Sequence, residues 1–285
     1  MKSAGLSYEI VVEPNQSWLR IDWREFWEYR DLLFLLVRRD FLSKYKQTVL
    51  GPAWFVLQPL LMSLVLALVF GQFAKVSTDG VPHLLFYLCN MLGWNYFAQN
   101  VTTGAATFTT NAHLFGKVYF PRLIVPLAGV VSNAFSFVLS LVLFLGFYAF
   151  FELFTSAGPT LHLGWLALAT PLLLLQTAVF SLGVSLWMSS LTARYRDLTH
   201  ATPLIIQLWM FATVVLPVSD IPPGWQWIAW ANPMSAVTES FRLALLGSGT
   251  LPASMLATSI AITIVAFCTG VMAFQKTERT VMDSV

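Results

Sequence analysis

Six long apolar runs without a charged residue in their interiors constrain this chain more than any other feature. They cover residues 53–74, 84–107, 122–150, 164–190, 199–218 and 251–274. A helix needs about 20 mostly apolar residues to cross the hydrocarbon core of a bilayer. Charged residues make up only 11% of the chain, whereas a soluble domain has about 25%. The runs therefore predict an all-α integral membrane protein with six transmembrane helices.

Lysine and arginine are distributed unevenly between the loops. Eight of them precede Pro52, and two lie in each of the second-to-third loop, the fourth-to-fifth loop and the C-terminal tail, which makes 14 of the 16 in the chain. Cytoplasmic loops carry the excess of positive charge. We therefore expect both termini in the cytoplasm, with an N-terminal segment at 1–51, a transmembrane domain at 52–275 and a tail at 276–285. The N-terminus has no apolar core of signal-peptide length.

The N-terminal segment contains aromatic residues at helical spacing. Trp23, Phe26, Trp27 and Arg30 fall at i, i+3, i+4 and i+7, with charged residues around them. Such a helix is typical of one that lies in the membrane interface with its aromatic side chains among the headgroups. The alternative is a soluble helix that packs on a partner, because amphipathicity alone does not distinguish the two kinds of burial.

The segment 219–250 on the outer side is predicted to be a re-entrant hairpin between spans five and six. Trp225, Trp227 and Trp230 fit an aromatic belt at the water boundary. The following amphipathic stretch is too short to cross the bilayer and ends at Gly247. Its two charged residues, Glu239 and Arg242, lie at i and i+3, where they can pair. They are candidates for an outer gate, and the alternative is an ordinary local salt bridge.

Polar, uncharged residues recur along the second run. Asn95, Gln99, Thr102, Ala106 and Thr110 share one helical face. Amides and hydroxyls can bind sugar hydroxyls, and aromatic rings can stack on sugars, so this face predicts the lining of a polar channel. The other predicted lining residues are Trp94 and Tyr96 beside it, Gln58 in the first run, and Gln207 and Trp209 in the fifth. The alternative is that such residues hold helices together.

Catalytic and nucleotide-binding motifs are missing from the sequence. The stretch NAHLFGKV at 111–118 contains Gly-Lys, but it lacks the first glycine and the Ser/Thr of a phosphate-binding loop. The four histidines are scattered, and the two cysteines lie far apart in apolar runs. We therefore expect no cofactor, no metal site and no enzymatic activity on this chain. A membrane glycosyl- or acyltransferase remains a remote alternative, which would need a cluster of acids or histidines.

Three long stretches carry a family resemblance. They are RRDFLSKYKQTVLGPAWFVLQPLL at 38–61, NAHLFGKVYFPRLIVPLAGV at 111–130 and ANPMSAVTESFRLALL at 231–246. In sequence and order they resemble the membrane subunits of ATP-binding-cassette polysaccharide exporters. O-antigen and capsule exporters are the most similar, and teichoic-acid exporters are more distant. A drug or small-lipid exporter of the same fold is an alternative.

The resemblance implies a homodimer in the bacterial inner membrane, bound to two cytoplasmic ATPase subunits that hold ATP and Mg²⁺. It implies export of a polysaccharide linked to undecaprenyl diphosphate and no interaction with nucleic acid. Lys44, Tyr45 and Lys46 would face either the carrier's diphosphate or lipid headgroups. A cytoplasmic coupling helix, which contacts the ATPase, would include Asn111, His113, Leu114, Phe115, Lys117, Phe120, Pro121 and Arg122.

Overall fold

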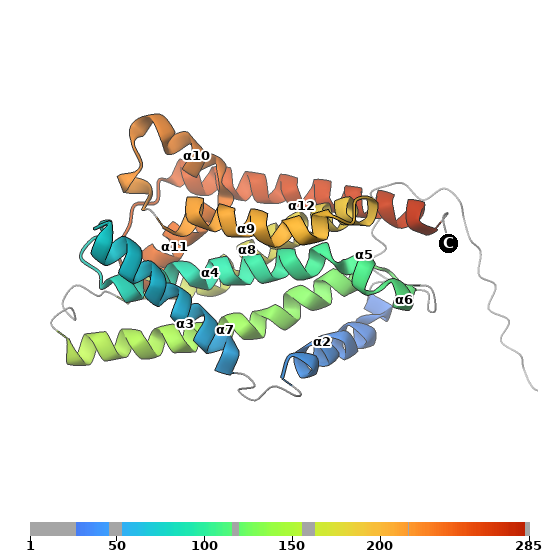
Figure 1. Ribbon diagram of the computed structural model, residues 1–285, viewed down its shortest axis with the longest axis horizontal. Coiled ribbons are helices and arrows are strands. Elements are labelled where there is room, and N and C mark those ends of the chain that lie inside the picture. The colour runs from blue at the N-terminus through green and yellow to red at the C-terminus, as the bar shows by residue number, and fades with distance from the viewer. Residues whose placement is uncertain (1–26, 46–52, 116–119, 156–162, 216, 283–285) are drawn as a thin grey trace, which may run out of the picture.

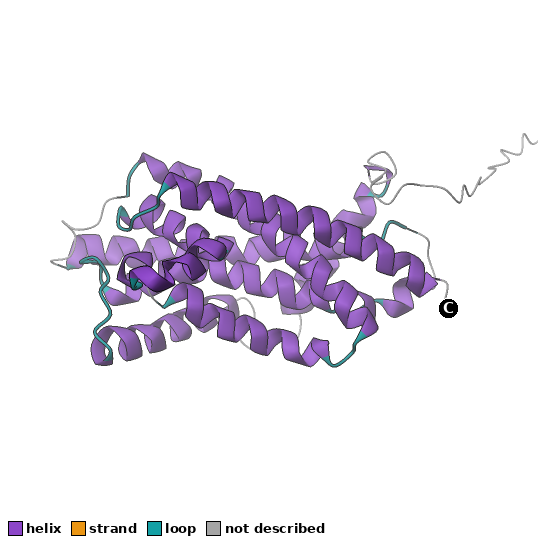
Figure 2. Ribbon diagram, turned by 90° about the horizontal axis from the view of Figure 1, so that it is seen from above, coloured by secondary structure: helices purple, strands orange, loops and turns teal. Residues whose placement is uncertain are grey.

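The computed structural model describes residues 27–45, 53–115, 120–155, 163–215 and 217–282. Within these ranges all regular secondary structure is helical (Figure 2), which confirms the all-α prediction. Four helices are long and apolar enough to cross a membrane, judged by length and composition. They are Val56–Phe73, Ile124–Phe154, Trp165–Arg194 and Ala253–Thr280.

The helices follow one another along the chain with short connections (Figure 1). The α-helices are α2 (Arg30–Tyr45), α3 (Ala53–Leu66), α4 (His83–Ala105), α5 (Thr107–Thr110), α6 (Ala112–Phe115), α7 (Ile124–Phe154), α8 (Thr170–Arg194), α9 (Leu198–Val214), α10 (Gln226–Ala231), α11 (Pro233–Leu246) and α12 (Ala253–Met282). The other helical turns are the π-helix η1 (Ala67–Phe73) and the 3-10 helices η3 (Trp165–Ala169), η4 (Val218–Asp220) and η5 (Pro223–Trp225).

Two of the six predicted spans differ from the other four. The second run forms α4, whose 23 residues are long enough to cross, but its polar side chains lower its hydropathy. The fifth run forms α9, which has 17 residues and is about 26 Å long. This is slightly less than the roughly 30 Å thickness of the hydrocarbon core. Four spans are supported by length and composition together, and the crossing by α4 and α9 stays a prediction.

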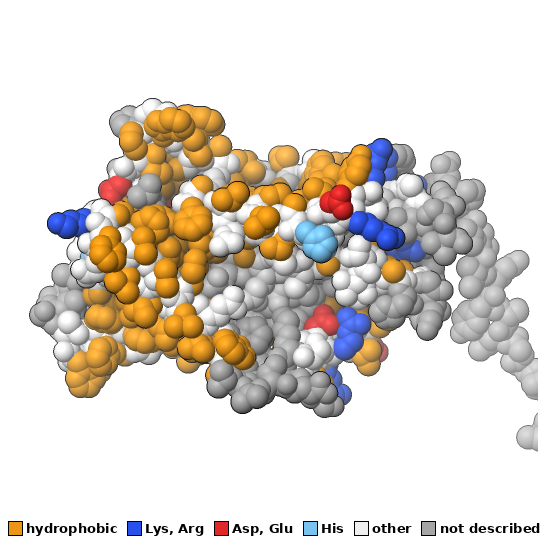
Figure 3. Space-filling view, viewed as in Figure 1, with side chains coloured by type: hydrophobic (Ala, Val, Ile, Leu, Met, Phe, Trp, Pro, Cys, Tyr) orange, Lys and Arg blue, Asp and Glu red, His pale blue; other side chains and the backbone are white. Residues whose placement is uncertain are grey.

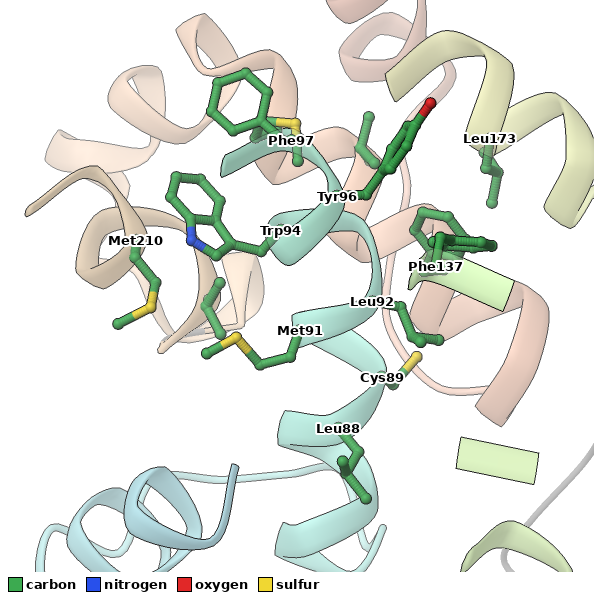
Figure 4. Packing of buried hydrophobic residues seen from close by; sticks show 14 of the residues in the cluster. Leu88, Cys89, Met91, Leu92, Trp94, Tyr96, Phe97, Phe137, Leu173 and Met210 are labelled. Atoms are coloured by element: carbon green, nitrogen blue, oxygen red, sulfur yellow. The ribbon is translucent and has the colours of Figure 1, made fainter. Parts of the chain in front are cut away.

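Helix α4 lies at the centre of the bundle, where it packs against α7, α8, α9 and α11. Side chains leave it in several directions, with Trp94 on the side of Met210 in α9 and Tyr96 on the side of Phe137 in α7 (Figure 4). Most of its residues are buried. A helix with many uncharged polar residues is therefore also the core of the subunit.

Helices α8 and α12 make the closest helix–helix approach through two glycines. A Cβ atom on Gly183 of α8 would lie 2.7 Å from the backbone of Phe267 in α12, and Gly270 faces Gly183 directly. Lipid supplies little hydrophobic drive for the association of membrane helices, so close van der Waals packing has to hold them together. Small residues make such packing possible, because they allow two backbones to approach each other. The pair therefore fixes how closely the C-terminal helix docks on the bundle.

Helix α2 packs against the start of α7 rather than standing apart from the bundle (Figure 1). Its buried Leu36 forms a cluster with residues of the following segment, which are Phe120, Ile124, Val125 and Ala128. The predicted interface residues Trp23 and Phe26 lie outside the described residues. Trp27 is 67% exposed, and the guanidinium of Arg30 lies 5.9 Å from the centre of its ring. The helix thus buries its leucine face and leaves Trp27 and Arg30 on the surface.

Charged side chains are unevenly distributed over the surface. Lys and Arg gather at the end of the molecule that carries α5, α6 and the C-terminus, while hydrophobic side chains cover much of the remaining visible face (Figure 3). The distribution of positive charge predicts that the end with α5 and α6 faces the cytoplasm, and this orientation stays a prediction.

Candidate functional site

Five residues along α4 and α5 lie on the accessible side of a helix that is otherwise mostly buried. We call Asn95, Gln99, Thr102, Ala106 and Thr110 the α4 polar face. Thr102 and Thr110 are exposed, and the other three are half-buried. A purely adhesive role would place these side chains in contacts between helices of the same subunit. Instead the face stays open to whatever lies beside the subunit, and it carries amides and hydroxyls without a charge.

Two aromatic residues predicted to line the channel lie inside the subunit. Trp94 is 2% exposed and Tyr96 is 3% exposed, and the Tyr96 hydroxyl donates a hydrogen bond to the backbone carbonyl of Val130 at 3.1 Å. The Tyr96 ring packs edge-on against Phe137, with the centroids 5.9 Å apart. The reason is geometric, because these two side chains project from α4 on the sides covered by neighbouring helices. In this conformation they hold the bundle together and touch no open face.

Of the remaining predicted lining residues, the two glutamines are exposed and the tryptophan packs inside the subunit. Gln58 of α3 and Gln207 of α9 are exposed. Trp209 is half-buried, and its indole N–H donates to the side-chain oxygen of Asn232 at 3.1 Å. Its ring lies 5.1 Å from that of Phe97 and 6.2 Å from that of Trp94. Trp209 therefore belongs to an internal aromatic cluster, whereas the two glutamines remain available at the surface.

A buried polar network crosses the middle of the subunit and was not foreseen from the sequence. The Asn133 amide of α7 donates to the side-chain oxygen of Asn100 at 2.8 Å, and the Asn100 amide donates to the Ser181 hydroxyl of α8 at 2.9 Å. All three residues are buried. The signal in the sequence is an asparagine within each of two apolar runs. The network ties α4, α7 and α8 together, which is the adhesive role considered for polar membrane residues.

At the other end of the bundle, the short helix α11 is buried rather than interfacial. It begins at Asn232, whose side chain accepts the backbone N–H of Met234, and it ends at Gly247 in a left-handed conformation, φ 68°. The predicted end at Gly247 is confirmed. The sequence predicted a short helix within a re-entrant hairpin. In α11 only Leu243 is not buried, because α4, α8 and α12 cover the helix, and the re-entrant path through the membrane stays a prediction. Trp225 and Trp227 are 63% and 65% exposed, and Trp230 is at the margin of exposure with 36%.

Glu239 and Arg242 form a buried ion pair within α11. Their side chains are 4% and 2% exposed, which excludes the solvent-exposed salt bridge considered from the sequence. The guanidinium of Arg242 donates to one carboxylate oxygen of Glu239 and lies 4.8 Å from the centre of the Phe86 ring. The other carboxylate oxygen accepts the backbone N–H of Val218 at 2.9 Å. The pair therefore connects α11 to the connection that follows α9.

Gly249 closes over this ion pair. Its φ of +105° lies in a region that favours glycine, and a Cβ atom there would be 2.8 Å from the Glu239 carboxylate and 3.2 Å from the Arg242 guanidinium. The glycine thus allows the backbone to cover the charges at close range. As a result, the two charges are enclosed by α11, η4 and the segment before α12.

The predicted coupling segment is folded onto its own subunit. The Asn111 carbonyl accepts the N–H of Leu114 at 2.9 Å, while its side-chain amide donates back to Thr107 at 3.2 Å. Leu114 and Phe115 are half-buried against the cluster around Leu36 of α2. Both side chains thus pack on their own subunit, and their contact with an ATPase partner stays a prediction. The side chain of His113 and residues 116–119, including Lys117, lie outside the description.

The C-terminal part of the segment is anchored to α12. Arg122 is 6% exposed; its Nε lies 3.8 Å from the Glu278 carboxylate, and it donates to the Glu278 carbonyl at 3.4 Å. Its guanidinium also lies 5.1 Å from the centre of the Phe115 ring. Phe120 is buried and Pro121 is half-buried. The start of α7 is thus fixed to both the N-terminal helix and the C-terminal helix.

Residues 31–246 match the family of the ABC-2 type transporters. The chain belongs to the ABC-2 transporter membrane family. This ABC-2 permease is therefore a multi-pass membrane subunit of an ATP-binding-cassette transporter, as the resemblance implied. The match includes α2, the coupling segment, the α4 polar face and the buried ion pair of α11.

Curated relatives of this ABC-2 permease cover most of its length. An O-antigen export system permease protein RfbA of Klebsiella pneumoniae is 31% identical over 225 residues, 78% of this chain and 82% of the relative. A second RfbA of the same organism is 28% identical over 213 residues, 74% of this chain and 79% of that protein. The RfbA of Myxococcus xanthus is 31% identical over 222 residues, 77% of this chain and 82% of the relative.

The described part of the permease contains no group of three or more His, Cys, Asp or Glu side chains that could hold a metal ion. Cys89 is buried and Cys268 is exposed. Lys44 and Tyr45 form the last turn of α2, and Lys46 falls outside the described residues, so their approach to headgroups or carrier stays a prediction. The features that stand out chemically are thus the α4 polar face and the enclosed ion pair.

Proposed function

We propose that this permease forms the membrane channel of an exporter that moves a lipid-linked polysaccharide such as O-antigen across the bacterial inner membrane. The carrier is undecaprenyl diphosphate, and ATP hydrolysis with Mg²⁺ takes place on a separate ATPase subunit. Two copies of the permease and two copies of the ATPase make up the transporter. Both termini face the cytoplasm.

The α4 polar face carries this proposal. It offers amide and hydroxyl groups for sugar hydroxyls, and it contains no charge that would hold a sliding glycan in one place. Gln58 and Gln207 extend the supply of neutral polar groups on α3 and α9. The names of the relatives, which are O-antigen export permeases, give the same class of substrate.

Coupling to the ATPase would take place at the end of the subunit that carries α5 and α6. The coupling segment connects there to α2 through Leu114 and Phe115, and to α12 through Arg122. A push on this segment would therefore reach three helices at once. Lys117 and the side chain of His113 are the candidates for direct contact with the ATPase. On the outer side, the buried pair of Glu239 and Arg242 would hold the gate region in one arrangement.

Deletion of the gene tests the proposal, with glycans analysed separately at the cell surface and inside the cell. We expect surface polysaccharide to disappear and lipid-linked polymer to accumulate on the cytoplasmic side. Complementation with the unmodified gene should restore the surface glycan. Unchanged surface glycan in the deletion strain would contradict the proposal.

A further inference from the structure

Two cavities lie beside helix α2, one with several polar residues in its lining and one with an almost wholly apolar lining. The first has a volume of about 350 Å³ and is lined by residues of α2, α4, α5 and α7. Its polar lining includes Thr102, Thr107, Thr110, Asn111 and Asn133. The second has a volume of about 620 Å³ and lies between α2 and α7. Its lining is largely apolar, with Phe34, Val37, Phe41, Val131, Phe135 and Val138.

Ser132 of α7 lines both cavities and joins them. It is 4% exposed, and its hydroxyl oxygen has no hydrogen-bond partner among the described residues. A buried hydroxyl without a partner costs free energy, so an unpaired one at a cavity wall points to a polar group from outside the chain. This residue lies about two turns into α7 from its cytoplasmic end.

The charges at the two cavities differ in their pairing. In the polar cavity, Arg39 donates from two nitrogens to Asp40 at 3.0 Å and 2.9 Å, so the pair leaves little net charge. Arg38 lines the apolar cavity and is exposed, and the described residues supply it with no ion-pair partner. The apolar cavity matches a lipid chain, Arg38, which has no ion-pair partner among the described residues, matches a phosphate, and the cavity with uncharged polar groups matches an uncharged head.

We infer that the two cavities form one binding site for a prenyl-phosphate glycan lipid. The prenyl chain occupies the apolar cavity, the phosphate binds Arg38, and the first sugar enters the polar cavity, where Ser132 hydrogen-bonds it. The choice of a glycan carrier over an ordinary phospholipid rests on the proposed function and on the continuity of this cavity with the α4 polar face. Thr102 and Thr110 belong both to this polar cavity and to the α4 polar face, so a head bound here already touches the start of the proposed path.

A photoreactive farnesyl diphosphate, with benzophenone on its tail, tests the site on the full-length permease in membrane vesicles. We expect labelling of α7 near Phe135. Val138→Trp should fill the apolar cavity and lower labelling about tenfold, the effect of losing roughly 1.4 kcal/mol of binding free energy. Its matched control is Val142→Trp, one turn further along the exposed surface of α7, where labelling should not change.

Two further variants test the residues proposed to bind the phosphate and the sugar, which are Arg38 and Ser132. Arg38→Gln should lower labelling, whereas Arg196→Gln, an exposed arginine far along the chain, should not. The probe carries no sugar, so Ser132→Ala should leave its labelling unchanged. The same variant should weaken competition by a prenyl-diphosphate-linked sugar about fivefold, as expected for one hydrogen bond, and should leave the fold intact because the hydroxyl has no described partner to lose. Undecaprenyl phosphate should compete with the probe, and phosphatidylglycerol at the same concentration should not.

Labelling that maps to another helix, or that is equal in the Val138→Trp and Val142→Trp proteins, would overturn the site. Equal competition by phosphatidylglycerol would overturn the carrier as its ligand and identify a phospholipid site. These outcomes differ from failure of the proposed function. If the gene deletion abolishes surface glycan while Val138→Trp and Arg38→Gln export and label normally, the function stands and this site is wrong.

Discussion

Glu239 and Arg242 lie one helical turn apart on α11 and form an ion pair that the surrounding helices enclose. One carboxylate oxygen binds the arginine and the other binds the Val218 N–H, so the pair connects α11 to the segment that follows α9. A buried ion pair adds little stability over well-packed apolar residues, but removal of one partner leaves an uncompensated charge. Its value here is in fixing the arrangement of α11.

We therefore expect Arg242→Leu to destabilise the permease by about 3–5 kcal/mol, because Glu239 would stay buried without its counter-charge. The double variant Glu239→Gln/Arg242→Leu should recover much of this loss. Glutamine keeps an oxygen for the Val218 N–H and carries no charge. Thermal unfolding of the purified protein in detergent measures both. A double variant that is less stable than Arg242→Leu alone would contradict the burial argument.

The α4 polar face predicts a defect in transport without a defect in assembly. Gln99→Leu and Thr102→Val each remove hydrogen-bonding capacity of about 0.5–1.5 kcal/mol from an accessible position, so export should fall roughly two- to tenfold. Surface glycan, measured against the amount of assembled permease in the membrane, is the readout. Val142→Leu, on an exposed and apolar position of α7, is the control and should export normally.

Tyr96 should behave differently from Gln99 although it is only three residues away. Tyr96→Ala removes a buried ring that packs on Phe137, and such a change costs about 3–5 kcal/mol in a core. We expect a reduced yield of folded protein and a lower unfolding temperature. If Tyr96→Ala left stability intact and abolished export, the side chain would act in the channel after all.

The buried asparagine network gives a comparison between adjacent residues. Asn133→Ala leaves the Asn100 oxygen without its donor, and we expect a loss of about 1–3 kcal/mol in the free energy of unfolding. Ser132→Ala, at the preceding position and equally buried, removes a hydroxyl that has no described partner. Its unfolding temperature should be unchanged or higher. Equal losses in the two variants would show that the network contributes nothing specific.

Two glycines in membrane helices should respond in opposite ways to alanine. Gly183→Ala would place a Cβ atom 2.7 Å from the backbone of Phe267, so α8 and α12 would have to move apart. Gly146→Ala in α7 meets nothing within 4 Å. Because alanine favours a helix over glycine by up to about 1 kcal/mol, Gly146→Ala should be neutral or stabilising. The measurement is the unfolding temperature of each variant in the same detergent.

Arg122 tests whether the coupling segment depends on the C-terminal helix. Arg122→Glu would place two carboxylates together at Glu278, and we expect less folded permease and lower ATPase stimulation. The exchange Arg122→Glu/Glu278→Arg should restore part of the yield, since the charges are opposite again. Lys117→Glu should instead leave the yield of permease unchanged and impair only the coupling to the ATPase. Full coupling in the Lys117→Glu protein would remove Lys117 from the contact.

The class of the protein and much of its organisation could be predicted from the amino-acid sequence. Hydrophobic runs of membrane length leave a helix as the available structure, because a backbone in lipid has to satisfy its own hydrogen bonds. The spacing of Asn95, Gln99, Thr102, Ala106 and Thr110 predicted a shared face, and periodicity along one helix suffices for that. The end of α11 at Gly247 was likewise a local property, since glycine adopts the left-handed conformation readily.

Which sides of these helices are covered depends on how the helices pack against one another. Trp94 and Tyr96 are as suitable for a channel as Gln99, but neighbouring helices bury the first two and leave the third accessible. Glu239 and Arg242 have a spacing that fits either an exposed or an enclosed pair, and the packing of α4, α8 and α12 around α11 encloses them. Burial depends on contacts between residues far apart in the chain, such as Val218 with Glu239 and Arg122 with Glu278. A pattern within one segment contains no information about such contacts. The residues that share a helix face could therefore be predicted, whereas the helices that pack against that face could not.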